Sequence, residues 1–334
     1  MSHTIYVEEA ALALPKTQEI LARYPRARKI TVERYGEIFN PRAQNFRLQK
    51  QNPALILALK HDGFVLPAPP EYNIGGDHNF YFSHMMNCVY DCRYCFLQGM
   101  YQSANYVVFV NYEDFFARIA EQQAALPDGE RGWFFSGYDC DSLAFEPVTG
   151  FIDAALAHFA AHPQSMLELR TKSTQIRPLL RREAMDNVVV AFSLSPDAVV
   201  QRWEAKTPSL EKRLLAASRL AQQGWQIGLR FDPVVVTGDS IAAYRALFER
   251  VFAVLPEAAV HSVSLGPFRL PKPFYKKLVR IYPEESLFAG ETQINGNMIS
   301  AEAQQETQLL QACREAILSY IPQRKFFPCT EIPA

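Results

Sequence analysis

The chain has 334 residues, a formal net charge of −1 at pH 7, and a composition that is 49% hydrophobic and 21% charged. A chain of this length and composition can bury one large core, which excludes a disordered protein. Its near-neutral charge gives no overall attraction to nucleic acid, and its apolar runs are shorter than the roughly 18 residues of a membrane helix. Residues 1–16 show no signal-peptide pattern, so we expect a cytoplasmic protein.

Residues 1–75 form an N-terminal extension that ends in a stiff linker over 66–72, because proline resists both helix and sheet. After it, apolar strand-like segments alternate with amphipathic segments of helical length, such as 149–162 and 209–224. This alternation predicts parallel strands joined by right-handed crossovers. The expected strands cover 78–83, 131–137, 165–172, 187–195, 226–236 and 260–268.

We therefore expect an α/β fold in which residues 76–270 form a partial (β/α)6 barrel, with a doubly wound sheet as the alternative. The chain has neither a G-x-G-x-x-G nor a G-x-x-x-x-G-K-[ST] motif, which excludes Rossmann dinucleotide and P-loop sites. Residues 271–334 form a C-terminal extension. In it, Asn295-Gly296 predicts a hairpin turn, and a helix is expected over 301–321.

Three cysteines with the spacing C-x3-C-x2-C, namely Cys88, Cys92 and Cys95, follow the first expected barrel strand. Thiolates bind zinc or iron–sulfur clusters, and a cluster in a reducing compartment is more typical of this spacing than a disulfide. A structural zinc needs a fourth ligand, for which His84 is a candidate. Three thiolates on a [4Fe–4S] cluster leave one iron open to a small molecule.

The C-x3-C-x2-C spacing, with aromatic Tyr94 before the last cysteine, resembles the radical S-adenosylmethionine superfamily. The resemblance implies a [4Fe–4S] cluster whose open iron binds the methionine part of S-adenosylmethionine. Electron transfer from the reduced cluster then gives methionine and a 5′-deoxyadenosyl radical. In such enzymes the cofactors supply the difficult chemistry, and the protein supplies binding and orientation.

Residues 92–111 resemble the stretch that follows the cluster in the spore photoproduct lyase family. The segments DSLAFEPVTG, LRTKS, AFSLSP and RFDPVV resemble later segments of that family, so the resemblance extends over most of the chain. It implies a lyase that acts on a DNA lesion, a thymine dimer, and that receives electrons from flavodoxin or ferredoxin.

The resemblance also implies site residues. The cluster ligands are Cys88, Cys92 and Cys95. Lys172 would pair with the carboxylate of the cofactor and Ser193 would hydrogen-bond it, while Gly137 would let backbone amides approach it. The cofactor-binding residues are Tyr94, Ser136, Gly137, Lys172 and Ser193.

The chain departs from the family where hydrogen returns to the product radical. Tyr138 stands where the family has its hydrogen-donating cysteine, and Phe96 stands where it has a relay tyrosine. Cys140 lies two positions further on, where the family has a serine that contacts the cofactor. We expect Tyr138 to donate hydrogen and Cys140 to face the cofactor; the alternative is a shifted loop from which Cys140 reaches the substrate. Asp232, where the family has a small residue, precedes Pro233 and suggests turn chemistry.

Other functions stay open at this point. The same radical chemistry can act on RNA, a nucleoside or a peptide, and a zinc-stabilised nucleic-acid-binding module would need no catalysis. The expected hairpin, GETQINGNMIS, contains no Lys or Arg with which to probe DNA. Basic stretches at 23–29, 177–182 and 269–277 can bind phosphate or form solvated faces. Cys313 and Cys329 are too isolated to indicate a site.

Overall fold

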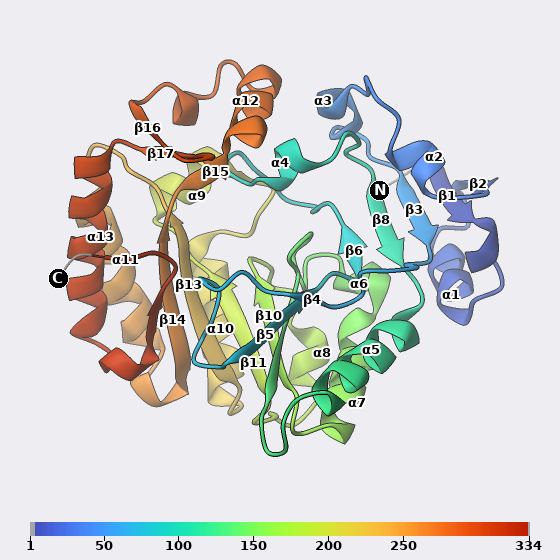
Figure 1. The fold of residues 1–334 in the computed structure, drawn as a ribbon, viewed down its shortest axis with the longest axis horizontal. Coiled ribbons are helices and arrows are strands. Elements are labelled where there is room, and N and C mark those ends of the chain that lie inside the picture. Colours follow the sequence, from blue (N-terminus) through green and yellow to red (C-terminus); the bar gives the residue numbers. More distant parts are fainter. Residues whose placement is uncertain (1–3, 333–334) are drawn as a thin grey trace.

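The computed structural model describes residues 4–332, whose largest sheet has eight strands and curls into a half-barrel (Figure 1). Its strand order is β18-β14-β13-β11-β10-β9-β5-β4, and every neighbouring pair is parallel except β4 with β5. The strands are β4 (Leu66–Pro67), β5 (His78–Phe82), β9 (Gly132–Ser136), β10 (Met166–Thr171), β11 (Val188–Ser193), β13 (Gln226–Val234), β14 (Val260–Pro267) and β18 (Phe326–Pro328).

All six expected barrel strands are present, so the α/β partial barrel is confirmed. They form where the sequence has short apolar runs; every residue of β11, for example, is buried, and a strand covered on both faces needs no polar alternation. The segment 66–72 differs from the expected linker, because its first two residues form β4 and pair with β5.

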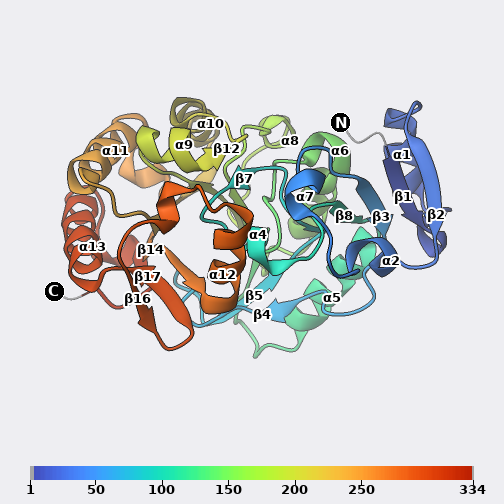
Figure 2. The same cartoon turned by 90° about the horizontal axis from the view of Figure 1, so that it is seen from above.

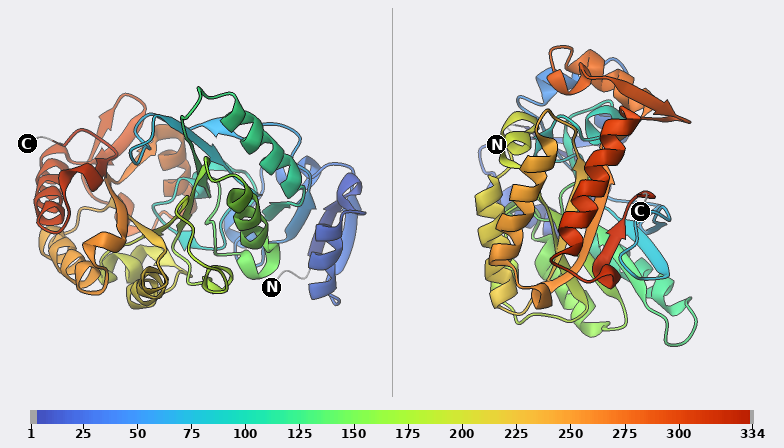
Figure 3. Two further views of the ribbon diagram at one scale, coloured as in Figure 1. Left: turned by 90° about the horizontal axis from the view of Figure 1, so that it is seen from below. Right: turned by 90° about the vertical axis from the view of Figure 1, so that its left-hand side faces the viewer.

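Helices cover the outer face of the half-barrel, as the view from below shows (Figure 3). The helix α10 begins after Ser209, whose side chain accepts a hydrogen bond from the Lys212 N–H, and Gly224 just beyond its end has φ of +93°. The covering helices are α5 (Tyr112–Ala124), α7 (Phe151–Ala161), α8 (Arg177–Leu180), α9 (Asp197–Trp203), α10 (Leu210–Gln222), α11 (Ser240–Val254) and α13 (Ala303–Leu318).

A second, five-stranded sheet lies beside the half-barrel and has the order β2-β1-β3-β8-β6. It combines strands from residues 1–75 with two strands from later in the chain. The boundary between the N-terminal extension and the barrel, expected at residue 75, therefore stays a prediction. The helix α1 (Pro15–Arg23) lies next to it (Figure 2). The strands are β1 (Thr4–Glu8), β2 (Arg28–Val32), β3 (Leu55–Ala58), β6 (Met85–Met86) and β8 (Tyr106–Phe109).

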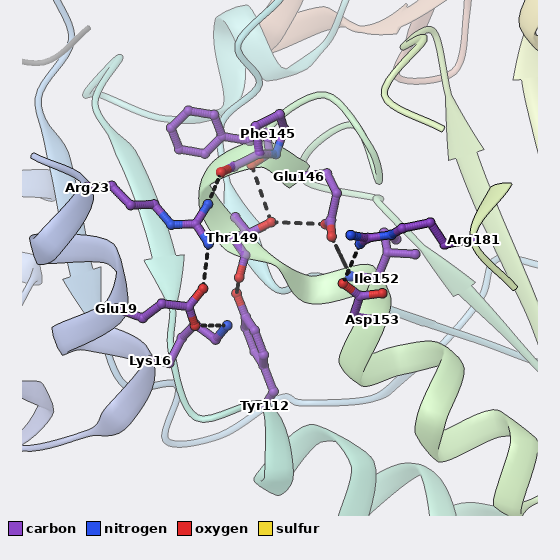
Figure 4. Close-up of polar contacts among 11 residues, drawn as sticks. Lys16, Glu19, Arg23, Tyr112, Phe145, Glu146, Thr149, Ile152, Asp153 and Arg181 are labelled. Carbon is purple, nitrogen blue, oxygen red and sulfur yellow. Dashed lines mark hydrogen bonds and ion pairs between the residues drawn. The ribbon is translucent and has the colours of Figure 1, made fainter. Parts of the chain in front are cut away.

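A polar network joins α1 to the short helix α6 (Glu146–Thr149) of the half-barrel (Figure 4). Arg23 donates to the carbonyl of Pro147, and the Tyr112 hydroxyl donates to the Thr149 carbonyl at 3.1 Å. The buried Glu146 carboxylate accepts the N–H of Ile152 at 3.1 Å. Burial raises the pKa of Glu146 to about 7, although these hydrogen bonds favour its ionised form.

The C-terminal elements cover the carboxyl ends of the barrel strands. The helix α12 (Lys272–Ile281) packs on α4 (Leu97–Met100), where a Cβ on Gly99 would come within 3.0 Å of the Phe274 carbonyl oxygen. The strands β15 (Arg269–Pro271), β16 (Thr292–Asn295) and β17 (Met298–Ala301) form a small sheet. The expected hairpin is confirmed, but Asn295 pairs with Met298, so the turn residues are Gly296 and Asn297.

Two short helices, α2 (Gly36–Phe39) and α3 (Phe46–Gln49), connect β2 to β3. Within residues 4–332, no helix is both long and apolar enough to cross a bilayer.

Candidate active site

A cavity of about 410 Å³ opens at the carboxyl ends of the barrel strands, beside β15 and α12. In parallel α/β structures this end of the strands is where ligand sites form, since loops from several strands meet there. Apart from His84, every residue that the sequence indicated as a metal, cofactor or catalytic candidate lines this one cavity. The fold thus brings together positions that are far apart in the sequence.

The three cysteines lie on a loop that a short strand holds in place. The strand β7 (Asp91–Cys92) pairs antiparallel with β12 (Glu204–Ala205), which sets Cys92 opposite Glu204. The Cys95 N–H donates to the Cys92 carbonyl at 3.1 Å, and Lys50 Nζ donates to the Cys88 carbonyl at 2.8 Å. All three thiols are free, and burial raises the pKa of each, that of Cys88 to about 12.

The donor set fits an iron–sulfur cluster, because three thiols on one loop are what such a cluster binds. Within residues 4–332, no three Cys, His, Asp or Glu side chains already converge as metal ligands, so the thiols must turn toward a bound metal. His84, the alternative zinc ligand, does not line the cavity. Its buried ring stacks on Phe151, with 3.9 Å between ring centroids, and burial lowers its pKa to about 3. This geometry favours a three-thiol site over a zinc site completed by His84.

A buried acid anchors the cysteine loop to the barrel wall. The Glu204 carboxylate accepts hydrogen bonds from the Tyr94 hydroxyl, from Ser195 at 3.1 Å and from Arg213 at 2.5 Å. Lys172 Nζ lies 5.6 Å from the Tyr94 ring centroid. Burial acts to raise the pKa of Glu204, but the charges of Lys172 and Arg213 outweigh it and lower that pKa. Glu204 is therefore an anion that holds Tyr94 beside the last cysteine.

Glu204 and Arg213 are missed by the sequence reading of the site. One signal was present: Arg213 falls on the apolar stripe of α10, together with Leu210, Leu214 and Ala217. An arginine that is 0% exposed needs a buried anion as its partner, which is Glu204. Arg213 also donates to the Ser193 carbonyl at 3.1 Å and so fixes the end of β11.

Two buried hydroxyls in the cavity have no hydrogen-bond partner within residues 4–332, those of Ser136 and Ser264. Unpaired buried hydroxyls are costly, so these atoms mark places where a ligand can bond. Next to Ser136, Gly137 has φ of +87°, and a Cβ there would lie 2.5 Å from Ser142 Oγ. Only glycine fits this turn, which keeps the backbone close to the cavity.

Asp141 fixes the loop that carries Tyr138 and Cys140. Its carboxylate accepts the Thr171 hydroxyl and the Lys172 N–H, each at 2.6 Å. The Tyr138 ring stacks on Tyr81 with 4.3 Å between centroids and is 38% exposed. Cys140 is 7% exposed and belongs to the apolar cluster of the five-stranded sheet, which we call the N-terminal sheet. It also lines the cavity. Which of the two donates hydrogen stays a prediction.

Another set of polar side chains in the cavity is formed by Asp232, Arg170 and Cys329. Asp232 lies in β13 and is not a turn residue; its carboxylate lies 3.7 Å from Arg170 Nη1. The thiol of Cys329, a residue that follows β18, donates to the same carboxylate at 3.5 Å. Cys329 is thus part of the cavity, whereas Cys313 is buried in α13 within the hydrophobic core. Sequence spacing could not show this for Cys329, because it depends on the pairing of β18 with β14.

Comparisons with known proteins agree with this architecture. The family model "Spore photoproduct lyase" matches residues 78–323. Spore photoproduct lyase of Bacillus subtilis (strain 168) is 26% identical over 98% of this chain and 96% of its own length. Spore photoproduct lyase of Geobacillus sp. (strain Y412MC61) is 25% identical over 61% of each chain.

Solved structures of spore photoproduct lyase variants have the same fold. One superposes with a TM-score of 0.83 at 18% identity, covering 99% of this chain and 98% of the other. Another, with bound AdoMet and dinucleoside spore photoproduct, gives a TM-score of 0.81 with the same identity and coverage. The chain therefore belongs to the spore photoproduct lyase family and is a radical S-adenosylmethionine lyase.

Proposed function

We propose that this protein reductively cleaves S-adenosylmethionine at a [4Fe–4S] cluster and uses the resulting radical on a thymine-derived lesion in DNA. The observation that supports this most is the meeting of the cysteine loop, Lys172 and unpaired hydroxyls in one cavity. Family membership and the dinucleoside lesion bound by a relative of the same fold agree with it.

In this proposal, Cys88, Cys92 and Cys95 hold the cluster. A bound and reduced cluster would supply the electron for reductive cleavage of the sulfonium, with methionine as the leaving group. Lys172 supplies a cation for the carboxylate of the cofactor, because Glu204 and Cys92 outweigh burial and raise the pKa of its ammonium. Ser136 at the end of β9 and Ser193 at the end of β11, on either side of β10, offer hydroxyls to the polar atoms of the cofactor.

The chain's own residues also shield the reaction. The helix α12 and the strand β15 cover the cavity and limit the access of water to it. The Glu204 network keeps Tyr94 against the cysteine loop, so that its ring forms a wall beside the place expected for adenine. The reductant is expected to be a flavodoxin or ferredoxin, in keeping with a cytoplasmic location.

The test is an anaerobic assay of the reconstituted, dithionite-reduced protein. We expect about four irons and four sulfides per chain, and 5′-deoxyadenosine whose formation changes when dinucleoside spore photoproduct is added. Cys92→Ala should abolish 5′-deoxyadenosine formation, whereas Cys313→Ala, which alters a thiol in the core, should retain it. One zinc without sulfide would contradict the proposal. Cofactor cleavage that responds only to an RNA or peptide would retain the radical chemistry and exclude the DNA substrate.

A further inference from the structure

The barrel interior is built in layers, because alternate residues of a strand point to the same side of a sheet. The deepest polar layer consists of Glu168, Arg230 and Ser262, all fully buried. Arg230 pairs with Glu168 at 2.7 Å and donates to the Ser262 hydroxyl at 2.9 Å. This layer is neutral and satisfied, so it has no capacity left for a ligand.

The next layer toward the cavity consists of Arg170, Asp232 and Ser264, each two residues further along its strand; we call it the reading layer. Within residues 4–332, the only hydrogen bond to the Asp232 carboxylate comes from the Cys329 thiol, and Arg170 lies 3.7 Å away. Ser264 is 2% exposed, and its hydroxyl has no hydrogen-bond partner among the described residues. The reading layer therefore presents an acceptor and two donors to the cavity.

We propose that the reading layer recognises the pyrimidine-2,4-dione edge of the substrate base, with Asp232 accepting the ring N–H and Arg170 and Ser264 donating to the flanking carbonyls. Thymine and its saturated derivatives present the complementary groups along this edge, namely a ring N–H donor between two carbonyl acceptors. An extruded base is read by hydrogen bonds to this edge. The inference rests on the proposed function and names a specificity residue for it.

Charge argues against a phosphate as the ligand of this layer. A phosphate beside Asp232 would place two anions together in a partly buried site, which is unfavourable. The layer instead matches a neutral group that both donates and accepts.

Aromatic side chains complete the proposed base site. Tyr81 and Tyr138 form a stacked pair on the cavity wall. Tyr72 lines the same cavity, and burial, followed by the charge of Asp232, raises its pKa. Arg269 lies 6.0 Å from the Tyr72 ring centroid. A flat base can thus lie against an aromatic face while its edge points toward Asp232.

The test is a double-mutant cycle between the protein and its ligand. The dissociation constants of the thymidine dinucleotide TpT and of its N3-methylated form are measured with cluster-loaded, S-adenosylmethionine-bound protein. Methylation removes the ring N–H, so we expect it to weaken binding about tenfold. Asp232→Asn should weaken binding of unmodified TpT by a similar factor, and methylation should then cost this variant much less.

Two further variants control the cycle. Ser264→Ala removes a hydroxyl that has no hydrogen-bond partner in the part of the chain that the structure describes, so the fold should be retained while TpT binding weakens several-fold. Asp239→Asn changes an exposed carboxylate before α11 and should behave as the wild type. The dissociation constant of S-adenosylmethionine should be unchanged in all three variants.

The outcomes separate this inference from the proposed function. Equal affinity for TpT and its methylated form, with normal 5′-deoxyadenosine formation, would overturn the reading layer and leave the function intact. Additive effects would also overturn the reading layer, that is, if N3-methylation weakened binding to Asp232→Asn by the same factor as it weakens binding to the wild type. Coupled costs in a protein that cleaves no cofactor would support the reading layer while the proposed function fails.

Discussion

Lys172 is the residue on which cofactor binding is expected to depend most. It directly follows β10, is partly buried, and lies among Glu204, Cys92 and the ring of Tyr94. Burial alone would favour the neutral amine, but Glu204 and Cys92 raise the pKa of Lys172 so that the ammonium persists at neutral pH. The side chain is thus a fixed positive charge at the edge of the cavity.

We therefore expect Lys172→Ala to raise the dissociation constant of S-adenosylmethionine about tenfold or more, since a charge-assisted contact contributes roughly 1.5–3 kcal/mol. Equilibrium binding to the cluster-loaded protein measures this, and the iron content should not change. Lys172→Arg should restore part of the affinity. Lys212→Ala, on the exposed face of α10, is the matched control. An unchanged constant in Lys172→Ala would make Lys172 a rim cation only.

Tyr138 and Cys140 differ in their surroundings, and this gives a second test. Burial raises the pKa of Tyr138 to about 12 and that of Cys140 well above its usual range, so both keep a transferable hydrogen at neutral pH. Tyr138 stands in the aromatic wall, whereas Cys140 packs toward the N-terminal sheet. We expect Tyr138→Phe to divert the product and Cys140→Ala to change cofactor binding. Product analysis that finds diversion only in Cys140→Ala would favour the shifted-loop alternative.

At the scale of elements, α6 gives a pH-dependent contribution to stability. The pKa of Glu146 is raised from 4.5 to about 7, so the folded state holds a proton that the unfolded chain has lost in this range. Its contribution is complete below pH 4.5 and is lost as the pH rises through 7. Glu146→Gln, which is always neutral, should make the free energy of unfolding less dependent on pH.

Urea unfolding at pH 5 and pH 8 checks this. The wild type should lose more stability than Glu146→Gln between these values, by at most about 3 kcal/mol. Glu183→Gln, at an exposed carboxyl before β11, should follow the wild type. An identical pH dependence in all three proteins would show that Glu146 is already ionised in the folded state.

The elements also show what the sequence can and cannot predict. Barrel strands such as β11 were predictable, because a buried parallel strand is a short apolar run between turn residues. The cysteine loop was predictable because its ligands are adjacent in sequence. The N-terminal sheet was not, since its strands are short and pair across distant segments. Asp232 was misread for a local reason: an Asp-Pro pair is typical of turns, and only the course of β13, whose register with β14 shifts between Phe231 and Val234, places it in the barrel.

At the scale of the whole molecule, the net charge of −1 limits nucleic-acid binding to local patches. One of the three basic stretches, 269–277, spans β15 and part of α12 and contributes Arg269 and Phe274 to the cavity wall. The stretch 23–29 lies instead at the N-terminal sheet. Of these two stretches, 269–277 is the one placed to contact the backbone of a nucleic acid whose base enters the cavity.

We expect weak duplex binding that falls steeply with salt. Lys276→Ala, at an exposed position of α12, should weaken binding to all sequences equally and reduce the slope of log K against log[salt] by about 1. Lys29→Ala, in the stretch 23–29, should leave both unchanged. Fluorescence anisotropy over a salt series measures the slope. Tight binding to undamaged duplex that is insensitive to salt would contradict this prediction.

The pairing of β18 with β14 has a consequence for biogenesis. This contact sets Cys329 against Gly266 and Asp232 and completes the floor of the cavity. The cysteine loop, in contrast, leaves the ribosome long before this floor exists, and chains begin to fold from the N-terminal side during synthesis. The nascent chain therefore passes through a stage in which its cluster ligands are accessible while the base site is still incomplete. The order of synthesis thus makes the cluster ligands available before β18 docks.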